Sequence, residues 1–179
     1  MKRVDISGSP LTVVRADITD QRVDAIVTAA NSELLGGGGV DWAVHRAAGP
    51  RLLEACRKIG GCPTGHAVST PAFDLEKNGV RVVIHAVGPI WRGDGSEDRL
   101  LESAYRSSLQ LAENLGCASI AFPAISTGFY GFPLERAAGI AIGVTRTFAE
   151  KDAKRLKRIV HVLFDSTSYA IFERLLATV

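Results

Sequence analysis

Short apolar segments rich in β-branched residues alternate along the chain with segments whose apolar residues recur at helical spacing. The short segments have the length and composition of β-strands, and several are apolar at consecutive positions. Strands that are apolar on both faces are typical of a largely parallel sheet covered by helices on each side. The predicted strands are LTVVRA (11–16), DAIVTAA (24–30), HAVSTPA (66–72), RVVIHAVG (81–88), SIAFPAI (119–125) and RIVHVLF (158–164).

Helical spacing of apolar residues predicts two helices in the second half of the chain. The segment from Glu97 to Leu115 opens with acidic residues, and Gly116 is placed as its C-terminal cap. Near the end of the chain, Ser168 is placed as the N-cap of a second helix. Because no repeat or linker interrupts the pattern, we predict one three-layer α/β domain over residues 1–179.

Composition places the chain among ordinary globular proteins. Hydrophobic residues make up 46% of its 179 residues, and 21 basic against 19 acidic side chains leave a net charge of +2. This charge offers no broad field for nucleic acid or an anionic membrane, so we expect neither as a partner. No apolar stretch is long enough for a membrane span, and the N-terminal stretch 1–17 lacks the apolar core of a targeting segment. We expect a cytoplasmic monomer.

Cysteine and histidine placement gives no sign of a metal or cofactor. Three cysteines without a CxxC pair argue against a disulfide framework and against a thiolate zinc site. There is no H-E-x-x-H motif and no carboxylate cluster at metal spacing. His85 and His161 lie inside apolar strands, where a hydrogen-bonded core imidazole is favoured over a ligand, and His66 follows a turn. We therefore expect no metal and no cofactor.

Three unusual loops follow predicted strands. They are ADIT (16–19), the glycine run within NSELLGGGGVDWAVHRAAG (31–49), and PAISTGFYGFP (123–133). Ligands of open α/β sheets bind beyond the carboxyl ends of the strands, where such loops turn into helices. The three loops converge there if the sheet is parallel.

The four consecutive glycines favour a phosphate-binding backbone. Each glycine costs up to about 1 kcal/mol of extra chain entropy on folding, so a run of them indicates a use that side chains would prevent. Permissive backbone can turn several N–H groups toward one point beside a helix N-terminus and so form an anion nest. A flexible surface loop is the alternative. The Rossmann pattern fails at its last glycine, and a Walker A loop is excluded because no lysine lies between Arg22 and Lys58.

The loop 123–133 permits three interpretations. Its A-x-S-x-G sequence is one substitution from a nucleophile elbow, with Ser126 as nucleophile and His161 downstream, although Gly131 and Pro133 delay the following helix. It can also be a plain turn. In the third interpretation the backbone of Ser126, Thr127 and Gly128 encloses a diphosphate, and Phe129 and Tyr130 wall the neighbouring sugar.

Three separated segments, in order and spacing, resemble the macro domain family. They are residues 24–68, VIHAVGPIWRG (83–93) and AFPAISTGFYGFP (121–133), and the similarity runs through nearly the whole chain. It is greatest to MacroD-type ADP-ribose hydrolases and bacterial O-acetyl-ADP-ribose deacetylases. The resemblance implies a three-layer α/β/α sandwich with a mixed six-stranded sheet, and ADP-ribose in a cleft across the strand ends.

The resemblance also implies roles for individual residues. Asp17 would accept from the adenine amine and Ile18 would contact the adenine through its backbone, whereas without the family Asp17 can equally cap a turn. Asn31 would hold the distal ribose hydroxyls, although asparagine is also a common turn residue. Phe164 would pack on the adenine face or belong to the core. Gly38, Gly39 and Val40 would supply the phosphate nest.

Asp41 is the position on which catalysis depends. It is suited to be the N-cap of the helix that starts at Trp42. Yet a carboxylate beside an anion cradle repels the ligand unless it has another task. The resemblance supplies one, because Asp41 would orient or deprotonate a water that attacks at the distal ribose. His45 lies one helical turn later, either as a hydrogen-bonding neighbour of this group or in a structural role.

Three residues depart from the family pattern. Ala16 and Thr28 stand where the family usually has glycine and the first asparagine of N-A-A-N. Trp42 replaces a glycine directly after Asp41, where its ring can narrow the pocket, stack on a substrate or lie over the surface.

These observations lead to one main hypothesis and two others. The chain is expected to be a hydrolase that binds ADP-ribose and cleaves its ester-linked adducts, with Asp41 and Asn31 as catalytic residues. Its partners would be O-acetyl-ADP-ribose and mono-ADP-ribosylated acidic side chains of proteins. A non-catalytic reader of ADP-ribose, its activity weakened by Thr28 and Trp42, is the alternative. A third hypothesis, RNA binding through the adenosine pocket, has little support in the near-neutral charge.

Overall fold

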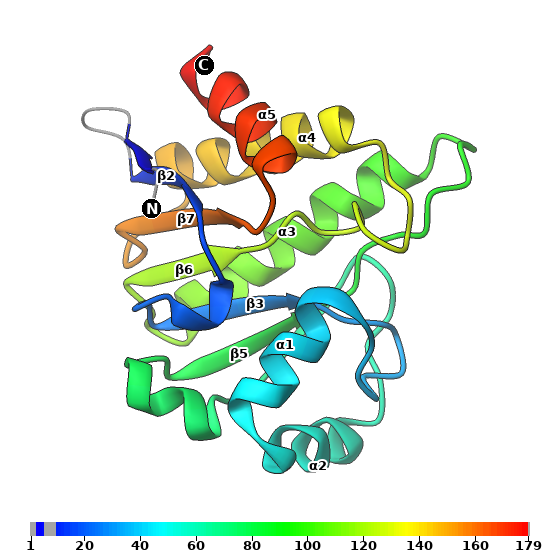
Figure 1. Ribbon diagram of the computed structural model, residues 1–179, viewed down its shortest axis with the longest axis vertical. Coiled ribbons are helices and arrows are strands. Elements are labelled where there is room, and N and C mark those ends of the chain that lie inside the picture. The colour runs from blue at the N-terminus through cyan, green and yellow to red at the C-terminus, as the bar shows by residue number, and fades with distance from the viewer. Residues whose placement is uncertain (1–2, 6–9, 179) are drawn as a thin grey trace.

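A mixed seven-stranded sheet lies between two layers of helices (Figure 1). The structure is a computed structural model that describes residues 3–5 and 10–178. The N-terminal stretch, in which we expect no targeting segment, falls partly outside these ranges. Within them, no helix combines the length and the apolar character that crossing a membrane would require.

The sheet contains every strand that the apolar pattern predicts. Five neighbouring strands run parallel, while β1 and β4 pair antiparallel at the two edges, in the order β1-β2-β7-β6-β3-β5-β4. The six predicted strands are β2 to β7, and β1 adds a seventh. The strands are β1 (Arg3–Asp5), β2 (Leu11–Arg15), β3 (Ala25–Ala29), β4 (Ala67–Pro71), β5 (Val82–Ala86), β6 (Ser119–Phe122) and β7 (Arg158–Leu163).

Alternate residues of the central strands enter two separate cores, which confirms the three-layer sandwich. In β3, Ala25 and Val27 face one core, whereas Ile26 faces the other. Three helices cover the first face, and they are α3 (Glu97–Asn114), α4 (Leu134–Lys151) and α5 (Ser166–Ala177). The second face is covered by α1 (Gly39–Ala48), α2 (Pro50–Ile59) and the short 3₁₀ segments η1 (Ile18–Asp20) and η2 (Phe73–Asn78).

Two predicted helix ends shift by a few residues. The C-cap of α3 is Leu115, and Gly116 follows it with a φ of +73°, a left-handed conformation that glycine adopts without a Cβ clash. The prediction that Ser168 caps the last helix is wrong. Asp165 is the N-cap, since its carboxylate accepts from the Ser168 N–H at 2.8 Å and from the Ser168 hydroxyl at 2.7 Å.

Candidate functional site

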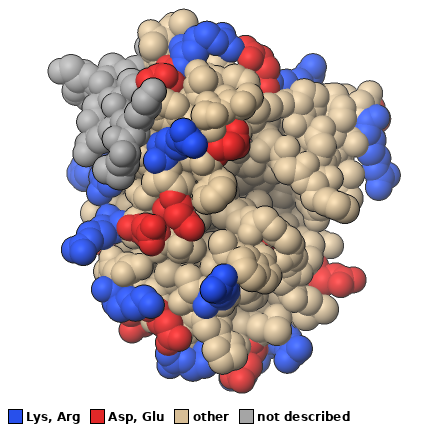
Figure 2. Space-filling view, viewed as in Figure 1, with Lys and Arg blue, Asp and Glu red and all other residues tan. Residues whose placement is uncertain are grey.

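The three loops singled out in the sequence lie on the same side of the sheet, at the carboxyl ends of its parallel strands. They follow β2, β3 and β6, which belong to the parallel set, so their carboxyl ends point the same way (Figure 1). The space-filling view from the same side shows a hollow beside these loops, and its visible walls carry few charged side chains (Figure 2). The parallel sheet thus confirms that the loops converge.

Backbone conformation explains two of the four glycines in the β3–α1 loop. Gly36 and Gly39 have φ values of +85° and +61°, which side chains rarely tolerate. Gly38 is the N-cap of α1 without any side-chain cap, and a Cβ added there would have open space around it. The first N–H groups of an α-helix have no partner within the helix, so the start of α1 can bind an anion.

Asp41 lies inside the first turn of α1 and is only 2% exposed. The interpretation of Asp41 as the N-cap is wrong, because the helix begins at Gly39, three residues before the predicted start, with Gly38 as its cap. The Thr28 hydroxyl donates to Oδ1 of Asp41 at 2.8 Å, and Nε2 of His45 lies 3.7 Å from the same oxygen. Burial raises the pKa of Asp41, while the bond from Thr28, the charge of His45 and the Gly37 N–H act in the opposite direction.

The side chains of Asn31 and Asp41 both lie close to Gly37. A Cβ built on Gly37 would lie 3.6 Å from Oδ2 of Asp41 and 3.8 Å from Nδ2 of Asn31. The Asn31 amide donates to the Gly36 carbonyl at 3.0 Å, whereas its Oδ1 is buried and has no hydrogen-bond partner. A buried acceptor left without a donor costs about 1–3 kcal/mol. The two polar groups therefore lie at the carboxyl end of β3, and Oδ1 of Asn31 is a buried acceptor without a donor.

The loop after β6 turns sharply at Ser126, whose φ is +67°. Its hydroxyl is buried without a partner, and the Phe132 N–H donates to the Ser126 carbonyl at 2.9 Å. The structure contains no Ser126–His161 pair, because Nε2 of His161 lies 3.0 Å from the hydroxyl of Thr145 instead. The helix α4 also begins only at Leu134. The nucleophile-elbow interpretation is therefore wrong.

The next residues of this loop, Thr127 to Tyr130, are exposed to different degrees. Phe129 is fully exposed, whereas Thr127 and Tyr130 are half-buried. The Tyr130 carbonyl accepts from the Trp91 N–H at 2.8 Å, and the Gly131 N–H donates to the Gly128 carbonyl at 3.0 Å. The loop is thus fixed by backbone hydrogen bonds while its outer side remains open.

Asp17 does cap a turn, as the alternative interpretation proposed. Its Oδ1 accepts from the Thr19 N–H at 2.8 Å and from the Thr19 hydroxyl at 2.7 Å, which starts η1, and Ile18 is buried in the core below. Phe164 is 80% exposed and directly follows Leu163, which pairs with Arg15. Phe164 is therefore not a core residue, and it lies at the same sheet edge as Asp17.

Trp42 lies over the surface of α1, one of the three positions that the sequence allowed. Its side chain is 56% exposed, and the guanidinium carbon of Arg46 lies 5.1 Å from the centre of its ring. This cation–π contact holds the ring along the helix.

Sequence reasoning missed the groups beneath Asp41. The thiol of Cys56 and the imidazole of His85 are both fully buried there. Burial, and then the charge of Asp41, raises the pKa of Cys56 to about 11, and burial, followed by the charge of His45, lowers the pKa of His85 to about 4. No motif could have found them, because α1, α2 and β5 bring distant residues together. His85 does behave as a hydrogen-bonded core imidazole, with the Thr70 hydroxyl 3.0 Å from Nε2.

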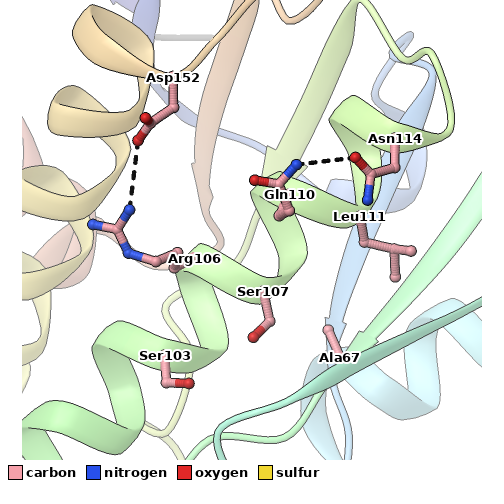
Figure 3. A pocket seen from close by; sticks show the side chains of 8 residues that line it. All are labelled: Ala67, Ser103, Arg106, Ser107, Gln110, Leu111, Asn114 and Asp152. Carbon is pink, nitrogen blue, oxygen red and sulfur yellow. Dashed lines mark hydrogen bonds and ion pairs between the residues drawn. The ribbon is translucent and has the colours of Figure 1, made fainter.

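A separate groove of about 510 Å³ lies along α3, and none of the predicted site residues lines it (Figure 3). Arg106 points toward Asp152, with 3.5 Å between the charged atoms, and Gln110 donates to Asn114 at 2.9 Å. The hydroxyls of Ser103 and Ser107, which also line the groove, donate to the Gly65 carbonyl, so these polar side chains already have partners. The candidate site therefore lies at the carboxyl ends of the parallel strands, where the loops after β2, β3 and β6 converge.

The fold and this edge define a three-layer α/β/α domain whose ligand loops follow β2, β3 and β6. The sequence model of the Macro domain family matches residues 27–141, and the chain belongs to this family. The chain is 53% identical over 173 residues to the O-acetyl-ADP-ribose deacetylase of Escherichia fergusonii, which covers 94% of this chain and 96% of the relative. The resemblance seen in the sequence is confirmed.

Solved structures of the family share this fold. The Oceanobacillus iheyensis macrodomain with ADP has a TM-score of 0.89 and 39% identity, over 99% of this chain and 95% of that one. The Trypanosoma brucei macrodomain in complex with ADP-ribose has a TM-score of 0.85 and 42% identity, over 92% of this chain and 68% of that one.

Proposed function

We propose that this chain binds ADP-ribose and hydrolyses ester-linked adducts of it. The observation that carries the proposal is the convergence of Asn31 and the buried Asp41 carboxylate on Gly37, between two loops suited to a diphosphate. The relatives support it, since the 53% identical protein is named O-acetyl-ADP-ribose deacetylase and the structural neighbours contain ADP or ADP-ribose.

In this proposal the two loops hold the diphosphate from opposite sides. The start of α1, with Gly38, Gly39 and Val40, and the backbone of Ser126, Thr127 and Gly128 supply N–H donors. Asp17 and Ile18 would contact the adenine, and the exposed ring of Phe164 comes from the same end of the sheet, where Arg15 pairs with Leu163. Phe129 and Tyr130 wall the distal ribose.

The proposed chemistry divides the Asp41 carboxylate between two tasks. Oδ1 is held by Thr28 and lies near His45, while Oδ2 is the oxygen on the Gly37 side. Oδ2 would orient a water at the distal ribose and take its proton as that water attacks the ester. Asn31, with its unpartnered Oδ1, would accept from a ribose hydroxyl and so fix the scissile bond. Binding of the remote adenosine and diphosphate supplies the positioning energy.

The proposal is tested by acetate release from O-acetyl-ADP-ribose with purified protein, beside release of ADP-ribose from a mono-ADP-ribosylated acidic peptide. A hydrolase turns over at least one substrate, whereas a reader module only binds ADP-ribose in calorimetry. Turnover of both substrates would mean that the loops recognise the ADP-ribose moiety and not the group attached to it. Turnover of one alone would identify the adduct that the site accepts.

The setting of the protein is part of the same proposal. The three cysteines Cys56, Cys62 and Cys117 are free and buried, which suits a reducing, cytoplasmic compartment. We place residues 1–179 together as one macro domain that acts as a monomer and needs no metal for turnover.

Thr28→Val should lower kcat about 10-fold and leave ADP-ribose affinity within about twofold. The substitution keeps the shape but removes the hydroxyl that donates to Asp41, a bond to a charged group worth about 1.5–3 kcal/mol. Loss of that bond raises the pKa of Asp41 further. Since the ionised carboxylate is the active form, the acid limb of the kcat–pH profile should move to higher pH. A profile that does not move would contradict this role of Thr28.

Trp42→Ala should change the turnover of O-acetyl-ADP-ribose by less than about threefold. The ring is exposed and packs on Arg46 rather than on Asp41, so little reorganisation at the reaction centre follows its removal. Steady-state kinetics of wild type and variant are compared under conditions in which both proteins are equally stable. A rise of tenfold or more would mean that the ring obstructs the site.

A further inference from the structure

Three potential metal ligands gather beneath the candidate site. His45 comes from α1, Cys56 from α2 and His85 from β5, and their ligand atoms all lie within 4.8 Å of one another. Cys56 and His85 are fully buried and His45 is half-buried. Nothing in the proposed hydrolysis uses the thiol or the imidazole of β5, so the cluster calls for its own explanation.

The distances within the cluster suit a small tetrahedral site. Sγ of Cys56 lies 3.8 Å from each ring nitrogen of His85, and Nε2 of His45 lies 3.7 Å from Oδ1 of Asp41. Zinc–nitrogen and zinc–sulfur bonds of about 2.0–2.3 Å place neighbouring ligand atoms roughly 3.3–3.8 Å apart. The 4.8 Å limit within the triad leaves about 1 Å of contraction for an ion to draw the ligands together.

The hydroxyl of Thr70 already orients the imidazole of His85. The Thr70 hydroxyl lies 3.0 Å from Nε2 of His85. A metal-bound imidazole commonly uses its other nitrogen in such a hydrogen bond, which fixes the ring and its tautomer. Nδ1 of His85 is therefore the nitrogen left for an ion, and Sγ of Cys56 lies 3.8 Å from it, as it does from Nε2.

We propose that the cluster of His45, Cys56 and His85 binds a divalent zinc-type cation, and that the Asp41 carboxylate, which lies outside this triad, moves in as the fourth ligand. Two imidazoles, one thiolate and one carboxylate form a ligand set that zinc and cobalt accept. The set is also balanced in charge. One thiolate and one carboxylate neutralise a divalent ion, so the complex puts no net charge into the interior.

The ion would act as an inhibitor. When Oδ1 of Asp41 coordinates the cation, the carboxylate leaves its bond with Thr28 and its position beside Gly37. The water at the distal ribose then loses its base. This consequence rests on the proposed hydrolysis, whereas ion binding itself does not.

Cobalt(II) absorption spectroscopy tests ion binding without any turnover. Wild-type protein titrated with Co²⁺ should show a sulfur-to-cobalt charge-transfer band and tetrahedral d–d bands that saturate at one equivalent, and Zn²⁺ should remove both. Cys56→Ala should abolish the charge-transfer band. Cys117→Ala is the matched control, because Cys117 is also a fully buried free cysteine but lies in the core under α3 and α4.

A second variant guards against loss of fold in Cys56→Ala. His45→Asn changes a half-buried residue and removes one nitrogen ligand, so it should weaken Co²⁺ affinity at least tenfold while the near-ultraviolet circular dichroism stays native. Absence of a charge-transfer band in wild type, or a band that survives in Cys56→Ala, overturns the site. Asp41→Asn tests the fourth ligand, and unchanged Co²⁺ spectra and affinity in it would remove Asp41 from the site.

Inhibition is measured separately. Zn²⁺ at one equivalent should suppress wild-type turnover of O-acetyl-ADP-ribose at least tenfold, and a chelator should restore it. Cys56→Ala should resist this inhibition. A protein that shows the cobalt spectrum but never hydrolyses the ester contradicts the proposed function and leaves the metal site standing. Full turnover by wild type with the site filled contradicts the inhibitory role.

Discussion

Asp41→Ala should reduce the turnover of O-acetyl-ADP-ribose at least 100-fold, because a positioned general base contributes about 10²–10⁴-fold to rate. ADP-ribose affinity should stay within about threefold, since the diphosphate is held by loop N–H groups and Asp41 is only 2% exposed. The initial rate of acetate release at saturating substrate gives kcat, and calorimetry gives the affinity for ADP-ribose. Wild type that is no faster than the variant would establish the reader alternative.

The same variant should not lose stability. Burial raises the pKa of Asp41, so the ionised carboxylate is less favourable in the folded chain than in the unfolded one at neutral pH. Alanine removes that cost, although the Thr28 hydroxyl and the Gly37 N–H lose this acceptor. We expect an unchanged or higher Tm in Asp41→Ala, a trade of stability for activity that is common at reaction centres. Asp41→Asn, which keeps the shape, serves as the control for packing.

The central sheet could be predicted because burial on both faces leaves a direct mark on the sequence. Residues such as Ala25, Ile26 and Val27 are all apolar since alternate side chains enter the two cores. β1 was missed for the opposite reason. It pairs with β2 over only Arg3–Asp5, a three-residue edge in which no apolar run is needed.

Helix caps were less predictable, because several polar residues near a helix start compete for the role. Asp41 and Ser168 both fit the N-cap preference, yet the caps are Gly38 and Asp165. In each case the chain begins its helix earlier, and the predicted cap becomes a residue of the first turn. The error at Asp41 is informative, since a carboxylate that does not cap is free to serve another purpose.

The loops of the candidate site could be located from sequence, but the environment of their side chains could not. Glycine composition and strand order indicated where the loops lie. The contact of Thr28 with Asp41 and the approach of Cys56 to His85 depend on how α1 and α2 pack on β3 and β5. No local pattern encodes such a packing. Thr28 was an unexplained departure from the family, and its hydroxyl turns out to bind the carboxylate.

Gly88→Ala should lower ADP-ribose affinity at least tenfold and destabilise the fold by about 1–3 kcal/mol, the usual cost of overpacking a buried site. A Cβ on Gly88 would lie 2.2 Å from Oγ of Ser126 and 2.5 Å from Cγ2 of Ile125. Oγ of Ser126 can turn away about χ1, but Ile125 is 1% exposed and packed on all sides, so relief of the contact with Cγ2 requires backbone movement. The loop that would hold the diphosphate must therefore shift, and calorimetry with ADP-ribose measures the result.

The control and a rescue separate loop displacement from general instability. Gly143→Ala lies on the exposed side of α4 with open space for a Cβ, so it should leave affinity unchanged and stabilise the helix by about 0.5–1 kcal/mol. Adding Ser126→Ala to Gly88→Ala removes the nearer clash and should restore part of the affinity. If Gly88→Ala binds ADP-ribose as tightly as wild type, the loop after β6 does not grip the diphosphate, because a displaced clamp cannot keep its N–H groups on the same oxygens.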